Sequence, residues 1–574
     1  MERSFAQTQH VLILLAGLLP TSCAYKDRAA DLVVHNAHII TLDSVEHEYQ
    51  AMAIVDGRIV ELGAEQQILN RYRAKESYDA AGAYIYPGFI DGHCHFLGYG
   101  LNKQKVDLSG SRSWAEVIER VTVFAKAHPE KTWIIGRGWD QNLWAEKEFP
   151  KNTELNKLFP DKPVLLQRVD GHAAIANAAA LHHAGITAET RIPGGEIVGR
   201  FTTPNGDRSW TDPKVVSEVE HMGYPFWEPT GLLVDNAVSM FQTIFDEADE
   251  TTKRRALLDA QRDCFAAGLT MVCDAGLDTG TIALMQRMQQ EGDLKIRIHA
   301  MVADAPANLE HFAKSGPIHT DRLDVRSVKV YGDGALGSRG ALLKQPYSDR
   351  AGHHGLQLAT REHFLEVAQW CKQHGFQMNT HCIGDSANKL LLEVYGEVLG
   401  GTNDLRWRIE HAQVVSPEDR SFFQRYSIIP SVQPTHATSD GPWAGDRLGP
   451  ERITSAYAYK DLLRTMGLLA LGTDFPVEGI DPLQTFRSAV LRTDGQGEPA
   501  GGYHSEQALT PLEALRGMTI WNALATFTEN DRGTLEVGKF ADFTVLDRDL
   551  LKSDAAGLAK VKVKRTYVNG EAVH

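Results

Sequence analysis

Cysteine is scarce in this chain of 574 residues, which contains six. One lies near the start, and the other five are spread over the rest of the sequence: Cys94, Cys264, Cys273, Cys371 and Cys382. Cysteines that are few and scattered do not form the framework of a disulfide-stabilised domain. Several of them lie inside strand-like apolar runs, which favours buried free thiols that pack as small hydrophobic side chains.

Basic clusters are also missing. The formal net charge is −15 at pH 7, and no run of lysine and arginine interrupts the sequence. This argues against nucleic acid as a partner, because a polyanion requires a basic surface. The content of 43% hydrophobic and 23% charged residues is typical of a soluble globular protein. A small neutral or mixed-charge substrate fits this composition, whereas the sequence leaves open whether the protein forms a homo-oligomer.

A long apolar segment is absent from the chain start. The apolar run over residues 11–19 is too short for a transmembrane helix and is typical of an export signal, so residues 1–24 are predicted to be a leader. Two processing routes remain open, a signal-peptidase cut after small residues or a lipid on Cys23 as in a bacterial lipoprotein. Pro20 stands where the lipoprotein motif usually has leucine, and Glu2 leaves a cytosolic leader as a third reading. The sequence predicts export to a bacterial periplasm or a lipid anchor in the cell envelope.

The two ends of the chain are rich in short strands. Residues 31–42 and 51–62 alternate apolar and polar positions, and Asp56-Gly57 is a strong hairpin signal. Residues 540–547 and 561–574 repeat this pattern, with Asn569-Gly570 as the turn. We therefore predict a small β-sandwich built from residues 25–82 and from residues 511–574, which also contain a terminal barrel helix.

The middle of the chain alternates strands and helices. Apolar strands are predicted at 84–95, 269–275, 295–302, 325–332, 376–381, 406–411, 428–433 and 468–474. Helix starts are readable at Ser416-Pro417 and Thr510-Pro511, where a capping residue precedes proline. Eight strands separated by helix-length segments indicate an α/β fold, a (β/α)8 TIM barrel over residues 83–510.

One connection is far longer than the others. About 170 residues separate the first predicted strand from the second, whereas one helix with its loops is enough for a barrel crossover. Residues 96–245 are therefore predicted to form a large α/β insertion, with strands near 133–138 and 164–169. Because the insertion leaves the barrel at the face where barrel active sites lie, we expect it to cover the active site.

Polar side chains end several predicted strands. His93 and His95 are two apart, so on a strand they point to one side and can share a metal ion. Later strands end in further polar groups that the same barrel mouth would collect: Lys329, His381, His411 and Asp474. Taken singly, a histidine of this kind can be a core residue and the lysine can face solvent. Together they indicate a metal site.

These residues, in this order, resemble the metal-dependent amidohydrolase superfamily. The resemblance covers nearly the whole chain after the leader, including a tail motif at residues 533–542. Motifs in the insertion and beyond it resemble the amidohydrolase 3 branch, which includes N-substituted formamide deformylases: Gly138-Trp139-Asp140, Asp170-Gly171-His172, residues 229–233 and Gly384-Asp385.

The resemblance implies the metal ligands. His93 and His95 would hold one divalent ion, and His381 and His411 a second. An ammonium has no lone pair for a metal, so Lys329 would act as N6-carboxylysine and bridge the two ions. A site with one ion and an unmodified Lys329 remains the alternative. Zinc is the default for these ligands, and iron, manganese or cobalt can occupy the same site.

Asp474 has the catalytic role in this interpretation, and it is also a metal ligand. It would take a proton from a metal-activated water and later pass it to the leaving amine. The predicted reaction is hydrolysis of a non-peptide carbon–nitrogen bond in an amide or formamide-like substrate. Cyclic-amide opening, deamination, and ester or carbamate hydrolysis remain alternatives on the same site, as does a non-catalytic exported binding protein.

Substrate contacts are predicted from the insertion and from the seventh strand. The candidates are His172, Arg168, Trp139 and His436, although a histidine or tryptophan at such positions can also simply pack. Gln141 and Trp144 could extend an apolar wall beside Trp139. Asp333 and Asp385 are expected to orient ligands. Cys94 alternates away from its histidine neighbours, so we expect it to pack behind the barrel wall.

Overall fold

The computed structural model describes residues 28–187, 190–203, 206–209, 227–241 and 248–574. The predicted leader over residues 1–24, with Cys23, lies outside these residues. Within the described ranges, no helix is both long and apolar enough to cross a bilayer.

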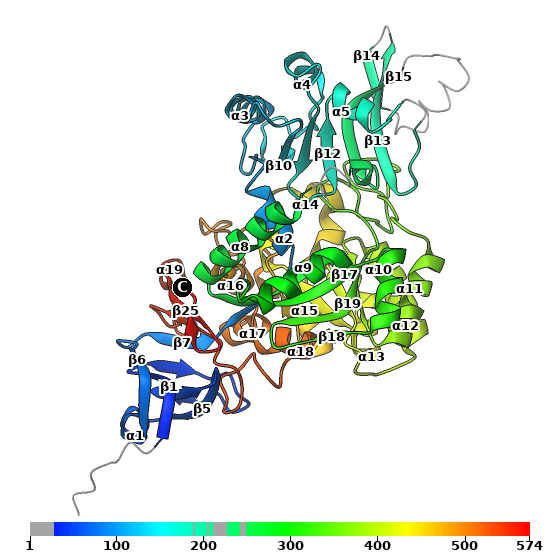
Figure 1. Ribbon diagram of the computed structural model, residues 1–574. Coiled ribbons are helices and arrows are strands. Elements are labelled where there is room, and N and C mark those ends of the chain that lie inside the picture. The colour runs from blue at the N-terminus through cyan, green and yellow to red at the C-terminus, as the bar shows by residue number, and fades with distance from the viewer. Residues whose placement is uncertain (1–27, 188–189, 204–205, 210–226, 242–247) are drawn as a thin grey trace, which may run out of the picture.

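A ring of eight parallel strands forms the centre of the molecule (Figure 1), which confirms the predicted α/β barrel. The strands follow one another around the ring as β8 (Phe89–Cys94), β16 (Leu269–Leu277), β17 (Arg297–Ala303), β19 (Leu323–Tyr331), β20 (Gln377–Cys382), β21 (Arg408–His411), β22 (Ile429–Val432) and β23 (Ala470–Leu471). A short strand, β18 (Ile318–His319), pairs with β19 outside the ring. The apolar composition predicted these strands well, because both faces of a barrel strand are covered.

The ring is closed between its first and last strands by polar contacts. The Asp474 amide donates to the His93 carbonyl and the His95 amide donates to the Phe475 carbonyl, each over 2.8 Å. The Asp91 carboxylate accepts from the Thr473 amide at 3.0 Å and from the Thr473 hydroxyl at 2.6 Å. These bonds fix the last strand end directly beside the two histidines of β8.

The helices of the barrel follow its strands in sequence, and most of them pack around the outside of the ring. They are α8 (Glu250–Ala266), α9 (Thr279–Gln290), α10 (Pro306–Ser315), α11 (Arg361–His374), α12 (Asp385–Leu399), α13 (Ser421–Arg425), α14 (Pro434–Arg452), α15 (Tyr459–Met466), α16 (Pro482–Leu491), α17 (Pro511–Gly517) and α18 (Ile520–Ala525). The predicted helix start at Thr510 is confirmed, since Thr510 and Glu513 form a capping box. Pro417–Asp419 instead form a single 3₁₀ turn before α13.

The first predicted barrel strand is wrong in one respect. Residues 84–95 form two strands in two sheets, β7 (Tyr84–Pro87) and β8, separated at Gly88. The Gly88 amide donates to the Asp542 carbonyl at 2.9 Å, and a Cβ at Gly88 would lie 2.3 Å from the Thr270 hydroxyl. The chain can therefore pass from the outer sheet into the barrel only because this residue has no side chain.

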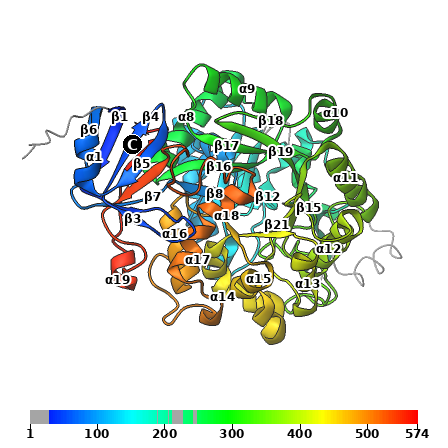
Figure 2. The ribbon, with the colours of Figure 1, turned by 90° about the horizontal axis from the view of Figure 1, so that it is seen from below.

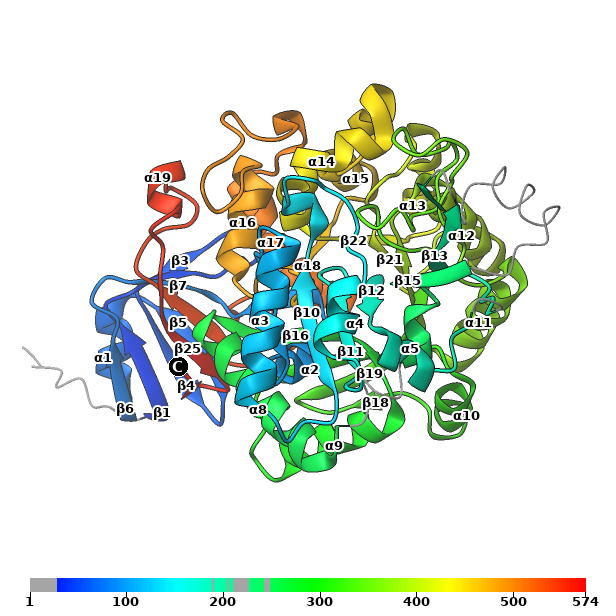
Figure 3. The ribbon, with the colours of Figure 1, turned by 90° about the horizontal axis from the view of Figure 1, so that it is seen from above.

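A seven-stranded sheet lies over one end of the barrel (Figures 1 and 3). Its strands come from the segment between β8 and β16: β9 (Val106–Asp107), β10 (Ile134–Trp139), β11 (Val164–Arg168), β12 (Ala173–Ala176), β13 (Gly195–Thr203), β14 (Gly206–Ser209) and β15 (Trp227–Asp235). Its helices are α2 (Phe96–Asn102), α3 (Trp114–Ala127), α4 (Thr153–Leu158) and α5 (Ala178–His183). This segment, here called the roof, has its own hydrophobic clusters.

The two chain ends meet in two small sheets beside the barrel (Figure 2). One contains β5 (Arg58–Gly63), β4 (Ala51–Val55), β1 (Arg28–His35) and β6 (Tyr72–Asp79), with α1 (Glu65–Arg71) beside it. The other contains β26 (Glu571–Ala572), β25 (Val563–Val568), β24 (Phe543–Leu546), β7, β2 (His38–Ile40) and β3 (Glu48–Tyr49), and α19 (Ala555–Leu558) lies between β24 and β25 in sequence. Met52 from the first sheet and Phe543 from the second share one hydrophobic cluster.

Candidate metal centre

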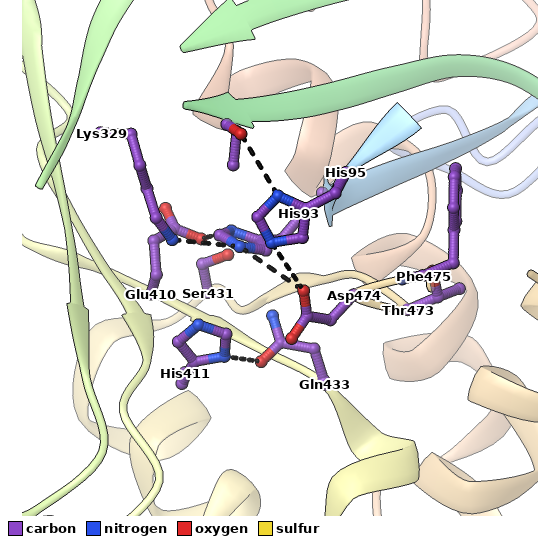
Figure 4. Close-up of polar contacts among 12 residues, drawn as sticks. His93, His95, Lys329, Glu410, His411, Ser431, Gln433, Thr473, Asp474 and Phe475 are labelled. Atoms are coloured by element: carbon purple, nitrogen blue, oxygen red, sulfur yellow. Dashed lines mark hydrogen bonds and ion pairs between the residues drawn. The ribbon is translucent and has the colours of Figure 1, made fainter. Parts of the chain in front are cut away.

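His93 and His95 lie at the end of β8 and point into the barrel mouth (Figure 4). The Nδ1 atom of His93 lies 2.6 Å from a Glu410 carboxylate oxygen, and Nδ1 of His95 lies 3.3 Å from the Ala275 carbonyl oxygen. Both acceptors fix the ring proton on Nδ1, which leaves a lone pair on each Nε2. Burial lowers the pKa of His93 to about 4, so its ring is neutral near pH 7, as a ligand must be.

Asp474 faces these two rings from the end of the last strand. Its Oδ1 atom is buried without a hydrogen-bond partner and lies 3.4 Å from His95 Nε2 and 3.9 Å from His93 Nε2. Two ligand atoms on one tetrahedral zinc ion are separated by about 3.3 Å. The three side chains therefore fit a shared divalent ion, which accounts for the unpartnered oxygen. Burial raises the pKa of Asp474 to about 7, against the opposing charge of Lys329.

A second group of possible ligands lies on the other side of Asp474. His411, His436 and Asp474 place one ligand atom each within 4.8 Å of one another. His436 Nε2 is buried without a hydrogen-bond partner and lies 3.5 Å from Asp474 Oδ2. The Nδ1 atom of His411 is held 2.7 Å from the Gln433 side-chain oxygen.

His381 lies beside this second group and not within it. Its ring centre is 4.6 Å from that of His411, but its Nε2 lies 3.4 Å from the Gly334 carbonyl oxygen. The structure thus places His436, predicted as a substrate contact, nearer to Asp474 than the predicted ligand His381. Asp333 accepts the backbone amides of Leu342, Ile383 and Gly384, so it holds the loop that follows His381.

Lys329 ends its strand inside the same mouth. The ammonium nitrogen lies 3.2 Å from His93 Nε2 and 4.9 Å from the centre of the Tyr331 ring. The side chain is fully buried, and burial lowers its pKa to about 8. Near neutral pH a noticeable fraction of Lys329 is therefore the free amine.

Glu410 is a site residue that the sequence reasoning missed. Its carboxylate receives hydrogen bonds from His93 and from Arg408, whose Nε lies 2.6 Å away, and Arg408 also donates to the Gly92 carbonyl at 2.6 Å. All three side chains are fully buried. Burial alone would raise the pKa of Glu410, but the charge of Arg408 and the hydrogen bonds from Arg408 and His93 hold it well below its usual range. Gln433 was missed as well, although it ends an apolar strand, the signal that identified its neighbours.

The roof residues predicted to contact substrate lie in different surroundings. His172 overhangs the mouth, with its ring centre 4.9 Å from that of His381 and its Nδ1 held 2.7 Å from Asp235. Arg168 is buried between Asp140 and Asp170. Trp139 donates to the Leu166 carbonyl at 2.8 Å and packs in the roof core, so the structure does not bring it to the histidines.

The remaining predictions concern groups behind the site. Trp144 packs against Trp139 in the same roof core, with 6.0 Å between ring centres. Asp385 accepts the Lys344 backbone amide at 2.9 Å, at the start of α12. Cys94 is fully buried in the main barrel core, which confirms its predicted packing, and the five cysteines of the described residues are unpaired.

Known proteins that are similar to this chain match it over nearly their whole length. It is 31% identical to YtcJ of Bacillus subtilis (strain 168) over 94% of this chain and 98% of that protein. It is 26% identical to the N-substituted formamide deformylase of Arthrobacter pascens over 94% of this chain and 97% of that enzyme. The crystal structure of an uncharacterized metal-dependent hydrolase from Pyrococcus horikoshii superimposes with a TM-score of 0.70 at 27% identity, covering 91% of this chain and 98% of that one.

A sequence model of the amidohydrolase family matches residues 76–205 and 218–574. The match runs from the first outer sheet through the roof and the barrel to the chain end. It therefore includes every strand that supplies a side chain to the mouth described above. The chain belongs to the amidohydrolase family and is a metal-dependent hydrolase.

Proposed function

We propose that this protein hydrolyses a non-peptide carbon–nitrogen bond in a small amide or formamide-like substrate. The observation that carries the proposal is the buried, unpartnered carboxylate oxygen of Asp474 between two groups of imidazoles. Burying a carboxylate oxygen without a partner is costly unless a cation or a proton donor binds there. The site therefore combines a place for a divalent ion with a proton-accepting group.

The ligand set supports zinc as the ion. His93, His95 and Asp474 would hold one ion, and His411 with His381 or His436 would hold a second. When bound, a divalent ion polarises the substrate carbonyl and lowers the pKa of a water molecule. Neutral imidazoles and a carboxylate suit zinc, and their buried partners Glu410 and Gln433 fix the orientation of His93 and His411.

Asp474 would carry the proton. It accepts a proton from the water that attacks the substrate carbonyl, and it donates that proton to the nitrogen as the carbon–nitrogen bond breaks. Burial raises the pKa of Asp474, so its surroundings favour the protonated form that donates to the leaving nitrogen. Water and amide give one carboxylic acid and one amine, so no further reactant is needed.

Lys329 would be carboxylated in the active protein. Its free amine adds to carbon dioxide and releases one proton, which leaves a carbamate whose two oxygens can each face an ion. The lowered pKa, the full burial and the 3.2 Å approach to His93 Nε2 support this assignment. The modification replaces a buried positive charge with a negative one beside the metal ligands, which favours cation binding.

The amide class is supported by one relative, since the Arthrobacter pascens protein is named an N-substituted formamide deformylase. A zinc-loaded sample should therefore be screened against N-formyl amines, N-acyl amines and N-acyl amino acids, with esters and carbamates beside them. Release of amine from at least one amide, and its loss in Asp474→Asn at similar metal content, is the expected result. Faster release from esters than from every amide would overturn the assigned bond, and full activity in Asp474→Asn would overturn the assigned base.

A further inference from the structure

Two arginines on neighbouring roof strands differ in their partners. Arg137 lies on β10 and Arg168 ends β11, and the two strands run parallel. Arg168 forms ion pairs with Asp140 and Asp170, and its Nε donates to the Gln141 side-chain oxygen at 2.8 Å. Its charge is therefore more than balanced inside the protein.

Arg137 has no such balance. It donates to the Val169 carbonyl at 3.1 Å and to the Gln167 side-chain oxygen at 3.4 Å, both of which are neutral. Its Nε is buried without a hydrogen-bond partner. Among the described residues, no carboxylate lies within ion-pair distance of this guanidinium. A largely buried cation with a free donor is costly, which makes it a ready receptor for an anion.

The guanidinium of Arg137 lies at the mouth of the metal centre. It packs against the loop between β11 and β12, where a Cβ at Gly171 would lie 3.3 Å from Nη2. The ring centre of the next residue in that loop, His172, lies 4.9 Å from that of His381, with the two rings tilted relative to each other. Arg137 is also close enough to Asp474 and His95 to lower the pKa of each.

We propose that Arg137 binds an anionic group of the substrate, and that the substrates are amides which carry a carboxylate. This inference rests on the proposed function and names its substrate class. A single planar guanidinium with an unpartnered Nε donor matches the shape and the single charge of a carboxylate. The protein has a net charge of −15, so this local cation would select an acidic substrate against the general repulsion of the chain.

Two matched pairs of substrates test the proposal with the zinc-loaded full chain. N-formylphenylalanine and N-formylphenethylamine differ by a carboxylate on the amine side, whereas N-succinylphenethylamine and N-butyrylphenethylamine differ by one on the acyl side. We expect kcat/KM to favour the acid of at least one pair by about tenfold or more, mainly through KM. In Arg137→Met this ratio should fall close to one, and Arg137→Lys should retain part of it.

The control variant is Arg112→Met, which removes an exposed arginine of the same roof and should keep the wild-type ratio. Preference for the neutral member of both pairs, or an unchanged ratio in Arg137→Met, would overturn the proposal. If Arg137→Met melts far below the wild type, the Arg137→Lys ratio decides instead: a ratio below the wild-type value supports the proposal, and a wild-type ratio overturns it.

A binding measurement separates this inference from the proposed reaction. If the wild type hydrolyses none of the four compounds, their rates cannot test Arg137, and calorimetry with 3-phenylpropionate and 3-phenylpropanol then tests it by binding alone. Two results together support the anion site: the wild type binds 3-phenylpropionate but not 3-phenylpropanol, and the affinity for 3-phenylpropionate falls by about tenfold or more in Arg137→Met. Absence of binding, or equal affinity in both proteins, rejects it.

Discussion

The barrel side and the roof side of the mouth are built differently. On the barrel side, His93, His411 and Asp474 come from strand ends and are almost fully buried, and a buried partner fixes each imidazole. On the roof side, Arg137 and His172 are partly exposed and lie on or against the loop after β11. In the proposed function, the barrel side carries out the chemistry and the roof side selects the substrate. Substitutions on the barrel side should therefore alter turnover and metal binding, whereas substitutions on the roof side should alter KM.

The largest effect is expected on the barrel side, in Asp474→Asn. Losing the proton carrier should lower kcat by about a thousandfold. The asparagine oxygen can still face the ion, so metal content should change little. Turnover and bound metal, measured by plasma mass spectrometry, check both parts. The control is Asp481→Asn, which keeps a capping oxygen at the start of α16 and should keep full activity.

Glu410→Gln should weaken metal binding. The variant loses the negative partner of His93, and such partners contribute about 10- to 100-fold in metal affinity. It also leaves Arg408 buried without its carboxylate, which should lower the free energy of unfolding by about 3–5 kcal/mol. Zinc titration and thermal melting measure the two effects. Ser431→Ala, which removes only a 3.1 Å contact to Arg408, should change both less.

Metal affinity should depend on pH through Asp474. Below its pKa of about 7 the metal-free protein carries a proton on this carboxyl, and the ion must displace it. The dissociation constant for zinc should therefore rise by about tenfold for each pH unit below 7. His93 and His436, with pKa values of about 4 and 3, stay neutral there. In Asp474→Asn this dependence should disappear, and a slope that persists would assign the proton to another group.

The smallest effect is expected on the roof side, in Asp235→Asn. Asp235 holds Nδ1 of His172 at 2.7 Å, so the change should raise KM by a few-fold through a poorly oriented ring. Bound metal should stay at the wild-type level, because no roof side chain belongs to either group of ligands. A loss of bound metal in Asp235→Asn would contradict the assignment of metal binding to the barrel side alone.

Much of the barrel side could be predicted from the sequence. The spacing of His93 and His95 places both rings on one face of a strand, and parallel strand ends converge at one mouth. The break at Gly88 could not be predicted, because it depends on contacts with Thr270 and Asp542 from distant segments. The predicted substrate contacts in the roof were less accurate, because a sequence does not distinguish a tryptophan that packs in a core, as Trp139 does, from one that binds substrate.

Glu410 shows why part of the site could not be predicted from the sequence. Consecutive residues on a regular strand point to opposite faces, so Glu410 and His411 should not both reach the metal centre. The backbone turns left-handed at His411, with φ of 72°, and at Ala412, with φ of 40°. This turn brings both side chains to the mouth. Asp474 also has a positive φ of 62°, and positive φ at residues other than glycine leaves little mark in a sequence.

The bonds that close the barrel have a consequence for how the protein is made. Asp91 and Thr473, which hold the first and last strands together, are 382 residues apart. A chain that has emerged from the ribosome only as far as residue 460 already contains the six histidines described at the mouth, yet it lacks Asp474 and the strand that positions it. Contacts over such separations form late in folding. The complete metal centre can therefore appear only after synthesis is nearly finished, so early folding must proceed without its stabilising effect.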